Sequence, residues 1–81
     1  ARTLQYPEIA AENGVQGKVI VQFVVEKDGS ISKATVVRGV DASLDKEALR
    51  VINKMDKWQP GKQGGKPVRV KYTLPIQFKL Q

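Results

Sequence analysis

The 81-residue sequence contains neither cysteine nor histidine. Without cysteine the chain can form no disulfide and no thiolate metal site, although this absence excludes no cellular compartment. Without histidine it lacks the commonest general base and the commonest transition-metal ligand. It also has no run of five basic residues and no apolar stretch long enough to span a membrane. We therefore expect no metal site and no cofactor.

The net charge is nevertheless +6, with a pI of about 9.9. This charge favours anionic partners, such as nucleic acid, an acidic surface or an acidic peptide. Because the basic residues are dispersed over polar positions, a solvated charged surface is the simpler interpretation. The length predicts one small domain. The first residues are Ala-Arg-Thr with no initiator methionine, which suggests a fragment of a longer protein.

Residues 43–61 predict the helix around which the chain is organised. Their apolar residues recur on one helical face, as in an amphipathic helix that lies on a sheet. Asp41 or Ser43 can cap the first turn, and Lys54 and Lys57 place positive charge in the last turn. The apolar positions are Leu44, Ala48, Leu49, Val51, Ile52 and Met55.

Three apolar segments around this helix predict strands. Residues 17–27 and 31–38 flank an Asp28-Gly29 hairpin turn. In residues 68–80, apolar and polar side chains alternate without error, which indicates one buried face and one solvated face. Pro75 lacks an N–H group and favours an edge position for this last strand.

Two shorter segments complete the predicted order. Pro7 is expected at the first position of a short helix that directs Ile9 and Ala10 inward and ends at Asn13-Gly14. Residues 62–67 are glycine-rich and are expected to form a flexible connector. The prediction is a two-layer α+β domain of order helix-strand-strand-helix-strand, in which the first and last strands of a three-stranded antiparallel sheet pair.

No constellation of residues predicts catalysis. Ser30 and Ser43 each begin a Ser-x-x-Lys pattern, but the companion motifs of penicillin-binding enzymes are missing. Residues 61–66 resemble a phosphate-binding loop, yet they precede a strand instead of a helix. The carboxylates lie in separate elements and offer no acid–base pair. We therefore expect that the chain is not an enzyme.

Tyr72 and Trp58 raise the alternative of a base-stacking platform for nucleic acid on the basic last strand. Tyr72 falls in phase with the apolar residues of that strand, so we interpret it as a core residue. Nucleic acid is therefore not expected as a partner. A basic module that binds nucleic acid or cell wall remains the alternative hypothesis.

Several of these pieces, in this order and spacing, resemble the TonB carboxy-terminal domain family. They are Tyr6-Pro7, then Gly17 and the Asp28-Gly29 turn, then Leu44-Asp45 and Ala48-Leu49, then Trp58-Gln59-Pro60-Gly61, and a closing alternating strand. The resemblance covers residues 6–80. It implies a single TonB-like domain over residues 6–81, preceded by an extended segment over residues 1–5. The sequence departs from some family members at Thr3, where they carry glutamine, and at Asp56, where they carry an aromatic residue.

The resemblance implies a periplasmic location, with a parent protein anchored in the inner membrane of a Gram-negative bacterium and joined to a motor complex there. The implied partner is the TonB-box peptide of TonB-dependent outer-membrane transporters, which the last strand binds by strand pairing. A long open edge strand suits this role. Alternatives are the TonB-like end of another membrane-anchored protein, and a homodimer formed through the same edge. The expected contact residues are Val68, Arg69, Val70, Lys71, Tyr72, Thr73 and Leu74.

Overall fold

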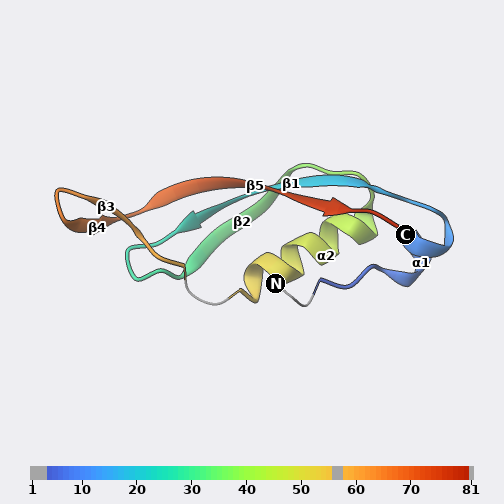
Figure 1. Ribbon diagram of the computed structural model, residues 1–81, viewed down its shortest axis with the longest axis horizontal. Coiled ribbons are helices and arrows are strands. Elements are labelled where there is room, and N and C mark those ends of the chain that lie inside the picture. Colours follow the sequence, from blue (N-terminus) through green and yellow to red (C-terminus); the bar gives the residue numbers. More distant parts are fainter. Residues whose placement is uncertain (1–3, 56–57, 81) are drawn as a thin grey trace.

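The computed structural model describes residues 4–55 and 58–80. A three-stranded antiparallel sheet, in the order β2 (Ile31–Arg38), β1 (Gly17–Val25) and β5 (Val70–Phe78), is covered on one face by helix α2 (Ala42–Asn53) (Figure 1). The α+β class and the pairing of the first and last long strands are therefore confirmed. The elements are α1 (Glu8–Glu12), β1 (Gly17–Val25), β2 (Ile31–Arg38), α2 (Ala42–Asn53), β3 (Gly61–Gln63), β4 (Lys66–Val68) and β5 (Val70–Phe78).

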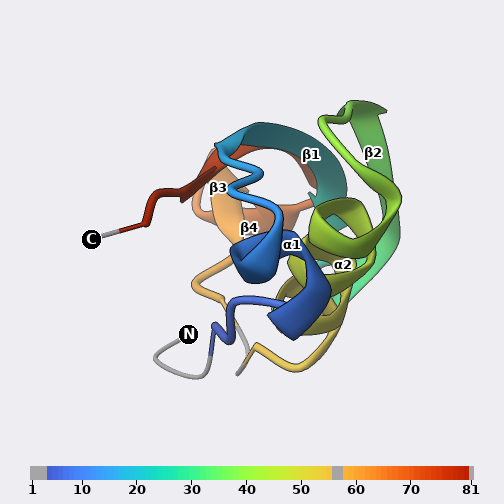
Figure 2. The same ribbon diagram turned by 90° about the vertical axis from the view of Figure 1, so that its right-hand side faces the viewer.

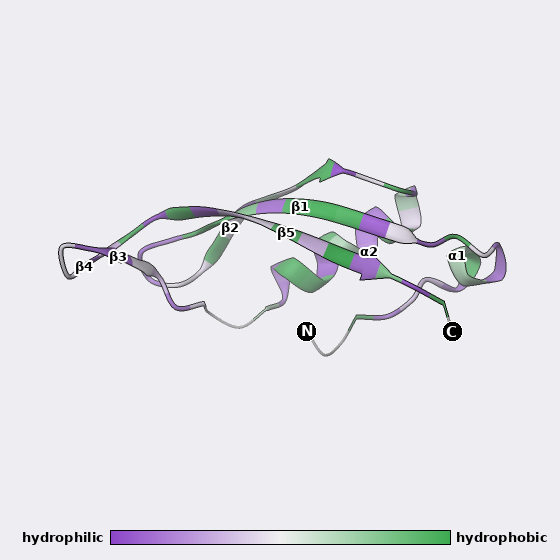
Figure 3. Ribbon diagram, turned by 45° about the horizontal axis from the view of Figure 1, so that its top comes forward, coloured by the Kyte–Doolittle hydropathy of each residue, from purple (hydrophilic) through white to green (hydrophobic). Residues whose placement is uncertain are grey.

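The core lies between β1 and α2, because each element presents one apolar face to the other. Figure 2, viewed along the long axis, shows the sheet curved over α2. The apolar positions of the strands and of α2 appear as green segments in Figure 3. Alternate β1 residues and the apolar stripe of α2 are buried: Val19, Val21, Phe23 and Val25 with Leu44, Ala48, Val51 and Ile52.

The first turn of α2 follows the predicted chemistry, whereas the helix ends at Asn53, so Met55 lies beyond it and the basic residue of its last turn is Arg50. Asp41 is the N-cap, and its carboxylate accepts a hydrogen bond from the Ser43 backbone N–H at 3.0 Å. The Ser43 hydroxyl also donates to this carboxylate and lowers the pKa of Asp41. Lys54 is the C-cap residue, whereas Lys57 lies outside the described residues.

The first segment of the chain differs in part from the prediction. Pro7 is the N-cap of α1 and not its first helical residue. Ala10 is buried as expected, but Ile9 is 64% exposed, so its predicted inward orientation is wrong. The reason is that α1 has only five residues and packs through a single position. Gly14, at φ +67°, ends the helix in the left-handed conformation that glycine adopts at low cost.

Residues 62–67 form a hairpin, so the prediction of a flexible connector is wrong. Strands β3 and β4 pair antiparallel around Gly64-Gly65, whose φ angles of +59° and +78° fit a two-residue turn. The closing pair of such a turn is hydrogen-bonded and the next pair is not. Pro67 stands opposite Lys62 in that next pair, where its missing N–H costs no ladder bond.

This hairpin extends the molecule at the end opposite α1 (Figure 1). The Cα radius of gyration is 14.2 Å, compared with about 12 Å for a compact domain of this length, and the longest extent is 49 Å. Gly61 lies so close to β5 that a Cβ there would be 2.5 Å from Val70 Cγ2. The base of the hairpin is thus packed tightly against the start of β5.

We predict that Ile52→Asp unfolds the domain, because the Ile52 side chain is 1% exposed and an unpaired carboxylate would be buried there at a cost of several kcal/mol. Thermal denaturation followed by circular dichroism measures the effect. Asn53→Asp, at the exposed next position of the same helix, is the matched control and should cost less than about 1 kcal/mol. A melting midpoint for Ile52→Asp within two degrees of the parent would contradict this assignment of the buried face.

Candidate functional site

The sheet has two edge strands, and they differ in regularity. β5 pairs with β1 through nine consecutive residue pairs, from Gly17 opposite Phe78 to Val25 opposite Val70, without a register shift. The pairing of β2 with β1 shifts twice, and each shift inserts an extra residue into β2. Such bulges are a common way to make an edge unsuitable for pairing with a further strand. β5 is therefore the regular edge, as Pro75 in the sequence suggested.

The bulge nearer the β1–β2 turn contains Lys33, at φ +54°. This left-handed conformation is unfavourable for a residue with a Cβ. The second bulge places Val37, which is 49% exposed, outside the ladder. Neither bulge carries a glycine or proline that would have predicted it from the sequence.

The backbone direction along β5 follows from Pro75. In a β-strand, alternate residues direct their side chains to the same face of the sheet. The backbone N–H and C=O groups of these residues also point to the same lateral edge of the strand. Pro75 lies opposite Ile20 and has no N–H to donate to β1. We therefore infer that the backbone groups of Pro75 point away from β1, toward the open edge of β5. Lys71, Thr73 and Gln77 share this orientation by alternation, and their N–H groups point away from the sheet.

The structure distributes the seven predicted contact residues over three segments. Val68 belongs to β4 and pairs with Gly61, and Arg69 forms the link between β4 and β5. Five residues lie in β5 itself, where alternate side chains are exposed. The last strand therefore begins at Val70 and not at Val68 as predicted, because Val68 pairs with Gly61 in the β3–β4 hairpin. The five are Val70, Lys71, Tyr72, Thr73 and Leu74.

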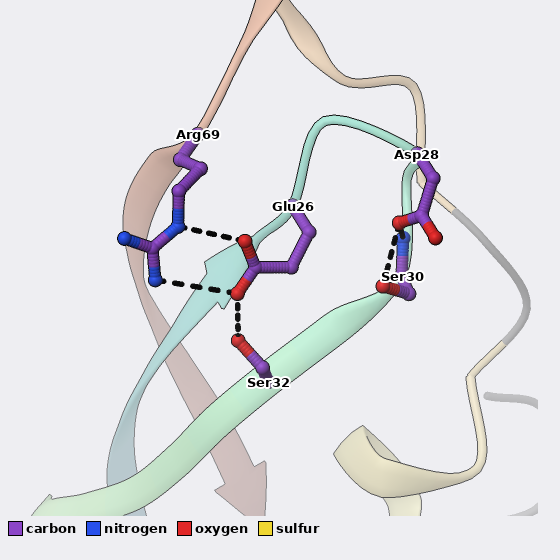
Figure 4. A network of polar contacts seen from close by, with 5 residues as sticks. All are labelled: Glu26, Asp28, Ser30, Ser32 and Arg69. Carbon is purple, nitrogen blue, oxygen red and sulfur yellow. Dashed lines mark hydrogen bonds and ion pairs between the residues drawn. The ribbon is translucent and has the colours of Figure 1, made fainter.

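Arg69, which directly precedes β5, is held by a network with Glu26, directly after β1, and Ser32 of β2 (Figure 4). Its Nε donates to Glu26 Oε1 at 2.7 Å and its Nη2 donates to Oε2 at 3.3 Å. The Ser32 hydroxyl of β2 donates to the same carboxylate. The hydrogen bond from Arg69 and then that from Ser32 lower the pKa of Glu26, and the carboxylate raises the pKa of Arg69. No local sequence pattern predicts this network, because Glu26 and Arg69 are 43 residues apart.

Aromatic contacts cover both ends of the β5 face that points toward α2. Trp58 lies 5.4 Å from Tyr72 between ring centroids, and Phe23 lies 6.0 Å from Tyr72. At the other end Tyr6 meets Phe78 edge-on at 5.6 Å. Helix α2 packs mainly on β1 and β2. Between these aromatic ends β5 presents two half-buried apolar side chains, Leu74 and Ile76.

No helix of the part of the chain that the structure describes covers the opposite face of the sheet. Cross-strand neighbours there form polar and basic rows, such as Thr35, Gln22 and Thr73. Tyr72 packs against the core on the other face, as predicted, so the platform needed for base stacking is missing from β5.

Other features of the described residues do not suggest chemistry. A hollow of about 500 Å³ lies between the N-terminal segment and α2, where Glu47 accepts from the Gln5 N–H at 2.7 Å and pairs with Arg50. Within residues 4–55 and 58–80, no three acidic residues come close enough to hold a metal ion. In the same ranges no helix is long and apolar enough to cross a membrane. Thr3 and Asp56, where the sequence departs from some TonB-like domains, lie outside the described residues.

Comparison with known proteins identifies the family. The family described as Gram-negative bacterial TonB protein C-terminal matches residues 2–80. The chain belongs to the TonB C-terminal domain family. This family is a non-enzymatic energy-transducer domain, so the prediction that the chain is not an enzyme is confirmed.

Individual relatives agree with this assignment. The chain is 34% identical over 79 residues to Protein TonB of Vibrio cholerae and 31% identical over 77 residues to Protein TonB of Pseudomonas aeruginosa. These matches cover 95% and 94% of this chain but only 32% and 22% of the two relatives. The chain therefore spans about a third or less of the length of these relatives.

Solved TonB C-terminal domains share the fold. The solution structure of the Helicobacter pylori domain, residues 179–285, superposes with a TM-score of 0.75 at 26% identity, covering 99% of this chain and 72% of that one. The Pseudomonas aeruginosa domain superposes with a TM-score of 0.71 at 28% identity, covering 95% and 78%.

The network around Glu26 predicts a pH dependence of stability. The folded-state pKa of Glu26 lies below its ordinary value of 4.5. The contribution of the ionised Glu26 side chain to the free energy of unfolding is therefore complete above pH 4.5 and is lost as the pH falls through the lowered pKa. Glu26→Gln should therefore flatten the acid limb of a plot of unfolding free energy against pH. Urea denaturation between pH 2.5 and 7 measures this.

Asp41 and Glu47 also have lowered pKa values, so part of the acid limb should remain in Glu26→Gln. Lys27→Gln, at the exposed neighbouring residue, is the control and should leave the limb unchanged. Parallel acid limbs for the parent and Glu26→Gln would show that the network does not act in solution.

Proposed function

We propose that this TonB-family domain binds a short extended peptide as an additional strand on the free edge of β5, and that the peptide is the TonB box of an outer-membrane transporter. In this proposal the domain is the periplasmic end of an energy transducer anchored in the inner membrane, and it supports active uptake. The observation that carries the proposal is the difference between the two sheet edges: β5 has an unbroken register, and β2 has two bulges.

The backbone of β5 offers a limited set of hydrogen bonds to such a strand. Lys71 and Thr73 each present one N–H and one C=O outward, between the Arg69 link and Pro75. Four such bonds at about 1 kcal/mol net each give on the order of 4 kcal/mol, which corresponds to millimolar binding. Ordering of the peptide reduces this further. The isolated contact is therefore weak, and tethering both partners to facing membranes would raise the effective affinity.

Side chains on both faces of β5 can add to the backbone bonds. On the face toward α2, apolar peptide side chains would cover Leu74, which is only half-buried. On the opposite face Lys71 is exposed and favours acidic peptide residues. Because most of the binding energy comes from backbone groups, one domain can accept peptides of differing sequence, which suits a transducer that serves several transporters.

We predict that Thr73→Pro abolishes binding of a TonB-box peptide. Proline removes the outward N–H and leaves the inward ladder to β1 intact, since Thr73 shares the orientation of Pro75. Thr73→Ala should change the affinity by less than about twofold, because the contact is made by the backbone. Titration of the ¹⁵N-labelled domain with a synthetic peptide, followed by NMR chemical shifts, measures both.

Gln77→Pro is the matched control, because Gln77 has the same orientation but lies beyond Pro75 and outside residues 68–74. It should bind the peptide as the parent does. If Thr73→Pro remains folded, as judged by its NMR spectrum, and still binds the peptide with parental affinity, the peptide does not add at this edge.

The alternative of a basic module for nucleic acid or cell wall predicts a different salt dependence. Counterion release makes the affinity for a single-stranded oligonucleotide fall steeply with salt, whereas strand pairing depends on it only modestly. We expect the peptide affinity to change by less than about threefold between 50 and 200 mM salt, and the oligonucleotide to bind more weakly than the peptide at the higher concentration. Tight, salt-sensitive oligonucleotide binding without peptide binding would favour the alternative.

A further inference from the structure

A hollow of about 350 Å³ lies on the helix-free face of the sheet, beside the β5 edge. Phe23 and Val25 point into the core, so Val24 between them faces away from α2. Val24 is nevertheless only 9% exposed, because the side chains that line the hollow surround it. The lining residues are Val24, Lys33, Arg69, Val70 and Lys71.

Three of these five residues are cations, and they come from different parts of the sheet. Lys33 belongs to β2, Arg69 to the link before β5, and Lys71 to β5. Glu26 neutralises Arg69 through the paired hydrogen bonds described above. Within residues 4–55 and 58–80, neither Lys33 nor Lys71 forms an ion pair. Glu26 also interacts with Lys33 through its charge, so the three cations and this one carboxylate leave a net charge of +2 around the apolar floor of the hollow.

The backbone at Lys33 also indicates a function for this side chain. A left-handed residue with a Cβ costs about 1 kcal/mol, and glycine or asparagine would occupy the same bulge at lower cost. Strain of this kind concentrates at functional sites. Here the bulge places Lys33 among the residues that line the hollow, together with Lys71 of the edge strand where a partner strand is proposed to lie.

We propose that this hollow is a carboxylate subsite, in which Lys71 and Lys33 together select an acidic side chain at one position of the added peptide strand. The proposal rests on the proposed function. A residue of the added strand directly opposite Lys71 has its Cβ about 5 Å from that of Lys71 on the same face of the sheet. A glutamate there reaches the Lys71 ammonium, and its carboxylate enters the hollow that Lys33 lines from the other side.

The alternation of a strand makes the selection specific to position. Apolar peptide residues on the Leu74 side fix the strand orientation, because a one-residue slip would expose them. Only residues of the other parity then face the hollow. An acidic residue is therefore favoured at alternate positions, and Lys33 acts on the choice of partner although it lies two strands from the contact.

The test uses the 81-residue chain and capped seven-residue peptides that alternate valine and threonine, with one central threonine replaced by glutamate or by glutamine. We expect the parent to bind the glutamate peptide about fivefold more tightly than the glutamine peptide, as for two exposed ion pairs. Lys33→Gln should reduce this ratio to about twofold. Lys33→Arg should restore it, since the charge and the reach are kept. NMR titration at 50 mM salt measures each dissociation constant.

Lys18→Gln is the matched control, because Lys18 is exposed on the same sheet face beside Gln77, away from the hollow, and its loss changes the net charge equally. It should leave the glutamate preference at the parental ratio. Lys33→Gly provides a second readout: it should raise the melting midpoint by about 4 °C through relief of the left-handed strain, while lowering the preference to about twofold, as Lys33→Gln does.

The outcomes separate the subsite from the proposed function. If both peptides bind the parent equally and Thr73→Pro abolishes their binding, strand addition is correct and the subsite is wrong. If Lys33→Gln and Lys18→Gln lower the preference for the glutamate peptide equally, the preference reflects only the net charge. This result would also overturn the subsite. If neither peptide binds, or if Thr73→Pro binds both as the parent does, strand addition at this edge and the subsite are both overturned.

Discussion

The ladder between β1 and β5 is the interaction on which the rest of the structure depends. It joins residues about 50 positions apart in the sequence, and its nine pairs have no irregularity. Because β1 is the central strand, the ladder fixes which β1 side chains meet α2 and which face solvent. Among residues 4–55 and 58–80, no further strand pairs with the outer side of β5. Stability and the candidate binding edge therefore have the same origin, and a change that disrupts the ladder would affect both.

Elements with a strong period could be predicted from the sequence. The alternation of β5 and the single apolar stripe of α2 gave both elements and their buried faces. Pro75 gave the edge position of β5. These signals are local, since each depends on the spacing of neighbouring residues and on the geometry of one element. The family resemblance gave the order of the elements for the same reason.

The features that were missed depend on contacts between distant segments or on small differences in backbone energy. The β3–β4 hairpin has polar, glycine-rich strands of three residues, and its base is fixed by the approach of Gly61 to Val70. The bulge at Lys33 places a lysine where the local preference is for glycine. The Glu26 network joins a residue just after β1, a residue of β2 and a residue just before β5. None of these can be derived from periodicity, and two of them shape the candidate site.

Pro75 has a consequence for any strand that pairs with β5. Outward N–H groups come from Lys71 and Thr73, but the next outward position has none. An added strand that extends past Thr73 therefore loses one hydrogen bond and meets a proline ring at the point where its own pairing would continue. Pro75 of this domain, and not the partner, would thus set where the pairing of such a strand ends. Partner segments of very different total length would therefore pair with β5 over the same short stretch of backbone. The residues beyond this stretch would remain unpaired with β5 and could belong to the folded part of the partner.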